Sequence, residues 1–335
     1  MKKLEFGNYT LKFGNKVLLD MYQDVVFPSF HEMKYLRKRG DTEYFFIDTQ
    51  VIKLSEEESG EPVVGLCGRI VKNTKLKRDQ IFVGESLVED PQELETAPSS
   101  VFLLVLNNHR LIFFKEVAGA PTIDNFRATS EYFLKQRHKE FIQELWEAGK
   151  AAREADSSQP RVTKNDLLAQ FAWPELRITP LTDRQNLNEF IGRFSQIEKL
   201  TIKLVPTNTE INNDDFWRKL ETSKNEMNSP STTISFSNKK EGLSSSEVLR
   251  QTVSATALGN SEIRVSGIDS EGGEIKGDNE DFDLTIDVED IPKDVPNAAA
   301  HVYSKFLELA EQGTITLPHL AQEVVDKIGE IYNRL

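Results

Sequence analysis

Acidic residues are concentrated in one short stretch near the C-terminal end of the sequence. Eight carboxylates fall within seventeen residues: Asp278, Glu280, Asp281, Asp283, Asp287, Glu289, Asp290 and Asp294. Clustered carboxylates can hold magnesium, so one hypothesis is a metal-dependent nuclease that uses the 278–290 cluster, with Asp283 and Asp287 as ligands. However, apolar and polar residues alternate through 282–289, and a period of two places the acids on the solvent face of a strand. The alternation therefore favours a solvated strand face, and we predict neither a bound metal nor another cofactor.

Basic residues form two segments in the first half of the sequence. The segment 34–39 carries four cations in six residues, and the segment 62–78 contains no acid. Around a predicted polar loop at 72–75, such cations could contact duplex DNA phosphates without reading base sequence, although an ordinary solvated loop has the same composition. The candidate DNA-binding residues are Lys34, Arg37, Lys38, Arg39, Lys72, Lys75, Lys77 and Arg78.

The remaining residues capable of chemistry show no catalytic spacing. No two histidines follow a His-x-x-x-His pattern, and none lies near the single cysteine, Cys67. The sequence thus lacks a zinc or Cys/His signature. We expect His109 and His301 on the surface and Cys67 as a small buried apolar residue. We predict no catalytic residues, so the sequence favours binding over catalysis.

The charge distribution divides the chain into unequal parts. Residues 1–204 carry 29 Lys and Arg against 30 Asp and Glu, whereas residues 205–335 carry 12 against 24. The acidic second part would be repelled by nucleic acid but could dock a basic partner. One cysteine excludes an internal disulfide framework, and the start lacks the apolar core of a signal peptide. We expect a cytoplasmic protein.

The elements that would position these residues begin with a β-rich region. Leu4–Leu19 contains two short runs broken by the turn dipeptides Gly7-Asn8 and Gly14-Asn15. Further strands are predicted at 44–54, 63–71, 80–83, 101–106 and 111–115. The last two are apolar throughout, which is typical of strands in mid-sheet that are covered on both faces.

A long helix follows, with Thr122 as its predicted N-terminal cap, and it ends in the polar stretch 156–160. We predict a boundary there, between a β-rich domain (1–155) and a mixed α/β domain (156–335). The predicted fold class is α+β.

The second half alternates predicted helices and strands before two final helices. Helices are expected at 165–171, 184–194, from 214 with Asn213 as cap, from Ser244-Ser245-Ser246-Glu247 as a capping box, at 297–311, and at 318–335 with Thr316 as cap. Strands are expected at 176–180, 200–205, 232–236, 262–267 and 282–288, with a turn at Gly272-Gly273.

The order of these elements resembles a known family. The apolar hairpin 100–114 is followed by Ala118-Gly119-Ala120-Pro121-Thr122 and a helix, then by the strand 176–181, the segments 190–193 and 197–204, the acidic strand and the helix near Asn297. This series, over roughly residues 100–312, is similar to RexA-like phage-exclusion proteins of bacteria. The resemblance implies a dimeric, non-enzymatic sensor in abortive infection that binds DNA without sequence preference. It also implies a separate effector, which in the family it resembles is a membrane protein, but supplies no individual site residues.

Three hypotheses therefore remain open from the sequence. The first is a phage-defence binding protein that contacts DNA through its basic segments and forms a homo-oligomer. The second is the nuclease, and the third is a protein-interaction subunit with an acidic docking surface.

Overall fold

The computed structural model describes residues 1–335 except 32, 55–60, 206–214, 228 and 230. Helices and strands both contribute substantially, and in the described part of the chain the strands form one sheet of ten strands and one of four. The fold is α+β, as predicted. No described helix combines the length and apolar character that a membrane span requires.

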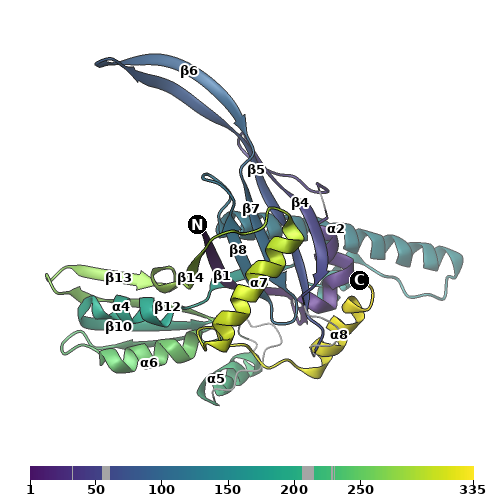
Figure 1. Cartoon of the computed structure of the whole chain (residues 1–335). Coiled ribbons are helices and arrows are strands. Elements are labelled where there is room, and N and C mark those ends of the chain that lie inside the picture. Colours follow the sequence, from purple (N-terminus) through teal and green to yellow (C-terminus); the bar gives the residue numbers. More distant parts are fainter. Residues whose placement is uncertain (32, 55–60, 206–214, 228, 230) are drawn as a thin grey trace.

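The large sheet occupies the centre of the molecule (Figure 1). Its strands run in the order β14-β1-β8-β7-β5-β4-β3, and β2, β6 and β9 pair with β1, β5 and β1 respectively. The bounds are β1 Lys2–Phe13, β2 Lys16–Val17, β3 Arg37–Arg39, β4 Thr42–Lys53, β5 Val64–Val83, β6 Ser86–Thr96, β7 Ser99–Val105, β8 Arg110–Lys115, β9 Glu175–Pro180 and β14 Thr285–Val288.

The hairpin of β7 and β8 lies in mid-sheet, which confirms the prediction from its apolar composition. Phe102 and Phe113 face one core, whereas Leu103 and Ile112 face the other. Side chains of a strand alternate between the faces, so a strand covered on both sides must be apolar at every position.

Helices cover both faces of this sheet. Against one face pack α2 (Ile123–Ala155), α3 (Lys164–Gln170), α8 (Gln322–Tyr332) and the short turns η1 (Leu18–Met21), η2 (Tyr22–Val26) and α1 (Phe27–Ser29). Against the other packs α7 (Val295–Glu311), which crosses the front of the sheet in Figure 1. Phe126 of α2 lies in the first core and Phe306 of α7 in the second.

The four-stranded sheet forms a smaller layer with its own core. It consists of β10 (Phe194–Leu204), β11 (Thr232–Ser237), β12 (Ser261–Asp269) and β13 (Glu274–Asp278), in the order β11-β10-β12-β13. The helices α4 (Arg184–Gly192) and α6 (Ser245–Thr256) pack on one of its faces, and η3 (Asn279–Phe282) leads back to the large sheet. The remaining helix is α5 (Asp215–Glu226); its predicted cap, Asn213, lies outside the described residues.

Strands from beyond residue 156 complete the large sheet. Both β9 and β14 pair with β1, and α7 and α8 contribute to its two cores. The predicted division at 155/156 therefore does not coincide with a division between the sheets.

Two predicted breaks in the strands are wrong. β1 runs straight through Gly7-Asn8, and Gly7 allows β9 to approach, since a Cβ there would lie 2.9 Å from Cγ2 of Ile178. The polar segment 72–75 is no loop but part of the 20-residue strand β5. The cause is β6, whose Glu95 and Glu93 stand opposite Lys75 and Lys77 and stabilise an extended pair.

Smaller differences concern helix ends and one histidine. The last helix begins at Gln322 rather than near Pro318, and Thr316 does not cap it. Ser244 precedes α6 but makes no capping hydrogen bond to the backbone; its hydroxyl lies 3.0 Å from Ser246 Oγ, and Glu247 pairs with Arg250. His109 is 1 % exposed rather than on the surface, and His301 is half-buried.

Candidate interaction surfaces

The register of the large sheet brings the two basic segments together. Arg37 of β3 stands opposite Tyr44 of β4, which in turn stands opposite Lys72 of β5. The Arg37 guanidinium lies over the Tyr44 ring, 5.4 Å from its centroid, and donates to Thr129 Oγ1 at 3.3 Å. Cations that are 35 residues apart in sequence thus occupy one row at the sheet edge.

Acidic neighbours neutralise most of these cations. Four ion pairs join candidate residues to carboxylates: Lys38–Glu43 at 2.8 Å, Lys75–Glu93 at 3.0 Å, Lys77–Asp41 at 3.3 Å, and Arg78–Asp90. The hydrogen bond to Glu93 raises the pKa of Lys75, as an ion pair requires. Within the described ranges, only Arg37, Arg39 and Lys72 of the eight candidates enter no ion pair, so the positive field at this edge is small.

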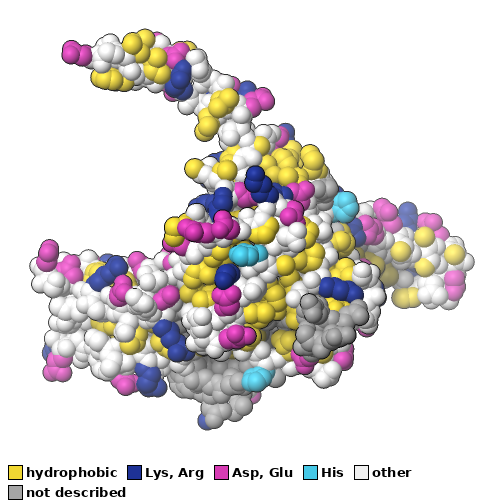
Figure 2. Space-filling model, in the orientation of Figure 1, with side chains coloured by type: hydrophobic (Ala, Val, Ile, Leu, Met, Phe, Trp, Pro, Cys, Tyr) yellow, Lys and Arg dark blue, Asp and Glu magenta, His cyan; other side chains and the backbone are white. Residues whose placement is uncertain are grey.

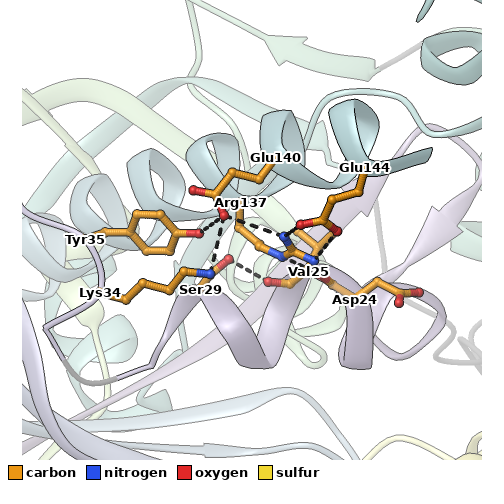
Figure 3. Close-up of polar contacts among 8 residues, drawn as sticks. All are labelled: Asp24, Val25, Ser29, Lys34, Tyr35, Arg137, Glu140 and Glu144. Atoms are coloured by element: carbon orange, nitrogen blue, oxygen red, sulfur yellow. Dashed lines mark hydrogen bonds and ion pairs between the residues drawn. The ribbon is translucent and has the colours of Figure 1, made fainter. Parts of the chain in front are cut away.

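Lys34 belongs to a bracing cluster on α2 (Figure 3). Tyr35 donates its hydroxyl proton to Glu140 Oε2 at 2.7 Å, and Lys34 Nζ lies 3.3 Å from the same oxygen. The Arg137 guanidinium donates two hydrogen bonds to the Glu144 carboxylate, from Nη1 at 2.5 Å and from Nη2 at 3.0 Å. These bonds raise the pKa of Arg137, chiefly through Glu144.

This cluster ties the segment before β3 to the helix, since Arg137 Nε also donates to the Asp24 carbonyl at 2.8 Å. These contacts stabilise the fold, and the ion pair with Glu140 neutralises the charge of Lys34.

The predicted acidic strand 282–288 is shorter in the structure, because Asn279–Phe282 form η3. What remains, β14, is an edge strand whose one carboxylate, Asp287, is exposed. Asp287 stands opposite Lys3 of β1, while Phe282, Leu284 and Val288 are buried. Burial raises the pKa of Asp283, with Lys3 acting in the opposite direction. Nowhere among the described residues do three or more His, Cys, Asp or Glu side chains gather as a metal site would require. This arrangement matches the period-two pattern of the sequence.

The pair β5–β6 leaves the sheet and projects from the body as a long ribbon (Figure 1). We call residues 74–96 the arm and residues 79–90 the arm tip. The strands pair from Thr74↔Thr96 to Val83↔Ser86 and are joined by the two-residue turn Gly84-Glu85. Gly84 has φ 64°, the left-handed conformation that such turns demand.

The arm tip is apolar and acidic. Phe82 is 70 % exposed and Leu87 is 68 % exposed, and Figure 2 shows hydrophobic side chains along the ribbon. Ile81, Val83 and Val88 complete the apolar set, while the charged residues of the tip are all acids: Asp79, Glu85, Glu89 and Asp90. Exposed apolar residues gathered at one place mark interaction sites.

A second apolar surface lies between α2 and α3. It is a groove of about 460 Å³ whose floor includes Ile142, Leu168 and Trp173 and whose rim includes Lys139 and Lys164. Trp173 remains 47 % exposed. Lys164 Nζ lies 5.0 Å from the centroid of the Trp146 ring, beside the groove.

The outward face of the four-stranded sheet is polar and of mixed charge. Arg264 stands opposite Asp278, and Lys203 pairs with Glu262 at 3.0 Å. The shallow groove along this face, about 700 Å³, is lined by cations and acids together. Because these charges balance, the groove has no net positive field that would attract a polyanion such as DNA.

Cys67 is fully buried in the sheet, and burial raises the pKa of its thiol to about 12, as expected of a small core residue.

The arm and the groove were missed by sequence reasoning. A signal for the arm exists in Ile81–Val83, Gly84-Glu85 and Leu87-Val88, two apolar runs around a glycine turn. No signal for the groove exists, because it forms from two helices that meet only in the folded chain.

Comparison with known protein families gives a match over part of the chain. A family model described as a domain of unknown function (DUF4747) matches residues 159–304, which span the four-stranded sheet, β9, β14 and the first part of α7. No curated protein matches the chain.

Proposed function

We propose that this chain is a non-enzymatic binding protein of bacterial phage defence and that the arm is its interaction element. The observation that carries the binding role is the arm tip: exposed Phe82 and Leu87 at the end of a ribbon that stands clear of the body. The phage-defence setting, with a separate effector, rests on the resemblance of residues 100–312 to RexA-like proteins.

Physical chemistry supports a protein partner at the tip. A two-stranded hairpin is marginally stable in water, and this one exposes apolar side chains on both faces near its end. Covering those side chains releases free energy of about 25 cal/mol per Å². Nucleic acid and anionic lipid are disfavoured, because residues 79–90 carry four acids and no cation.

The test is phage plating on bacteria that express the chain. We expect the wild type to lower plating efficiency for at least one phage of a broad panel, and Phe82→Asp combined with Leu87→Asp to abolish that protection. The control is Val117→Asp, at a position 54 % exposed on the body. Full protection by the tip variant would remove the arm from the proposal, and no protection by the wild type would remove the defence setting.

Duplex DNA binding is a second candidate, favoured by the row that joins Arg37 to Lys72 across β4. A gel shift at low salt should show a complex that weakens on Arg39→Ala with Lys72→Ala. Lys75→Ala is the control, because Glu93 already engages Lys75. No complex even at low salt, where counterion release is strongest, would dispose of this candidate.

A further inference from the structure

No residue that the structure describes covers the arm tip within the same chain. None of its residues belongs to the three hydrophobic cores, and Phe82, Val83, Leu87 and Val88 are all exposed. The tip therefore needs a partner surface that is apolar in the middle and positively charged around it.

The groove between α2 and α3 has that composition. Its floor combines Ile142, Leu168 and the half-exposed Trp173, and its rim carries Lys139 and Lys164. In the described part of the chain, neither lysine forms an ion pair with a carboxylate. Glu140 is the one acid of the lining, and Lys34 and Tyr35 engage it.

Shape and charge are complementary between the two surfaces. The tip offers Phe82 and Leu87 side by side, since they are cross-strand partners, together with Glu85 and Glu89. Aromatic and aliphatic residues can enter the apolar floor while the two carboxylates meet the rim lysines. The arm projects from the body in a different direction from α2 (Figure 1), so the contact joins separate molecules.

We propose that the arm tip of one copy docks in the α2–α3 groove of a second copy of this chain. The proposal rests on the arm being the interaction element and names its partner. Exchange of arms about a two-fold axis occupies both tips and both grooves and closes the assembly at two copies.

The experiment is a charge-reversal cycle on the full chain, read by light scattering after size exclusion. We expect the wild type to elute with twice the mass of one chain, 38.1 kDa. Glu85→Lys with Glu89→Lys should give the single mass, and so should Lys139→Glu with Lys164→Glu. Mixing the two variants, or combining all four changes in one chain, should restore the double mass.

Matched controls separate this effect from net charge and from misfolding. Glu241→Lys with Glu311→Lys makes the same charge change at exposed positions away from both surfaces and should leave the dimer intact. All charge variants should keep the wild-type circular dichroism. Lys164 occupies the first turn of α3, where an acid is well tolerated.

Three results would overturn the proposal. The first is a wild type that is monomeric at about 100 µM, a concentration well above typical micromolar dissociation constants. The second is a dimer that survives either charge reversal, and the third is a chain with all four changes that stays monomeric. A photo-reactive amino acid in place of Phe82 distinguishes failure of this inference from failure of the proposed function. Its crosslinking to another protein and never to a second copy would refute this inference while leaving the binding role of the arm in place.

Discussion

At the scale of single residues, buried polar groups hold distant segments together. Arg110, 1 % exposed, donates from β8 to the carbonyl oxygen of Leu258 at 3.1 Å and to that of Thr316 at 3.4 Å. A buried guanidinium that satisfies carbonyls after α6 and after α7 fixes both chain segments against the central sheet. Its removal leaves those acceptors without partners.

We therefore expect Arg110→Met to lower the free energy of unfolding by about 2 to 4 kcal/mol. Urea denaturation measures the loss. The control is Arg250→Met, which breaks only the exposed pair with Glu247 and should cost less than about 1 kcal/mol. Equal losses in the two variants would contradict the role of Arg110.

His138 links stability to pH. It is fully buried between Phe13 and Trp173, and its Nε2 lies 2.9 Å from the Phe171 carbonyl oxygen. Burial lowers its pKa below the unfolded value. The imidazole therefore binds a proton more readily in the unfolded chain than in the folded one. The stability that neutral, buried His138 contributes is complete above the unfolded pKa, about 6.5, and is lost as pH falls below that value.

The expected result is that His138→Gln removes part of the decline in stability between about pH 7 and about pH 5. Denaturation midpoints at both pH values measure it, with the exposed His31→Gln as control. An unchanged decline in the His138 variant would show that other groups cause it.

At the scale of elements, local signals set where the long helix begins. The Thr122 side chain accepts a hydrogen bond from Asn125 N, and the Asn125 side chain accepts one from Thr122 N. This reciprocal capping satisfies two donors that helix geometry leaves free. α2 also supplies Phe126 and Phe133 to the core, so its start is coupled to packing.

Thr122→Ala should cost about 1 kcal/mol of unfolding free energy. Ser244→Ala is a matched control, because Ser244 occupies the same position in α6 without a capping hydrogen bond and should cost less. Chemical denaturation of both variants decides, and a larger loss at Ser244 would contradict the assignment.

At the scale of the whole molecule, the large sheet depends on residues from both halves of the chain. β9 and β14 share one edge of β1, Phe306 of α7 lies in one core, and Ile328 of α8 lies in the other. A unit that ends near residue 155 would expose the apolar faces that these elements cover.

We predict that the fragment 1–155 does not fold cooperatively by itself. Its denaturation curve should be broad, and its amide proton spectrum poorly dispersed. The full chain, with a sharp transition, is the control. A cooperative fragment would show that the sheet is complete without β9 and β14.

Local patterns in the sequence predicted much of the fold. The apolar β7–β8 pair, the Thr122 cap and the outward Asp287 of β14 all follow from short-range periodicity or capping chemistry, which depends on neighbours in the chain. The α+β class follows from the same signals.

Only the tertiary structure decided what the charged residues face. The acids that neutralise Lys75, Lys77 and Arg78 come from β6 and from Asp41. The sequence of the basic segments does not predict these pairs. The buried setting of His109 and the α2–α3 groove likewise arise from segments far apart in sequence. Periodicity reports which face of an element is buried, whereas partners across a sheet or between helices exist only once the chain has closed on itself.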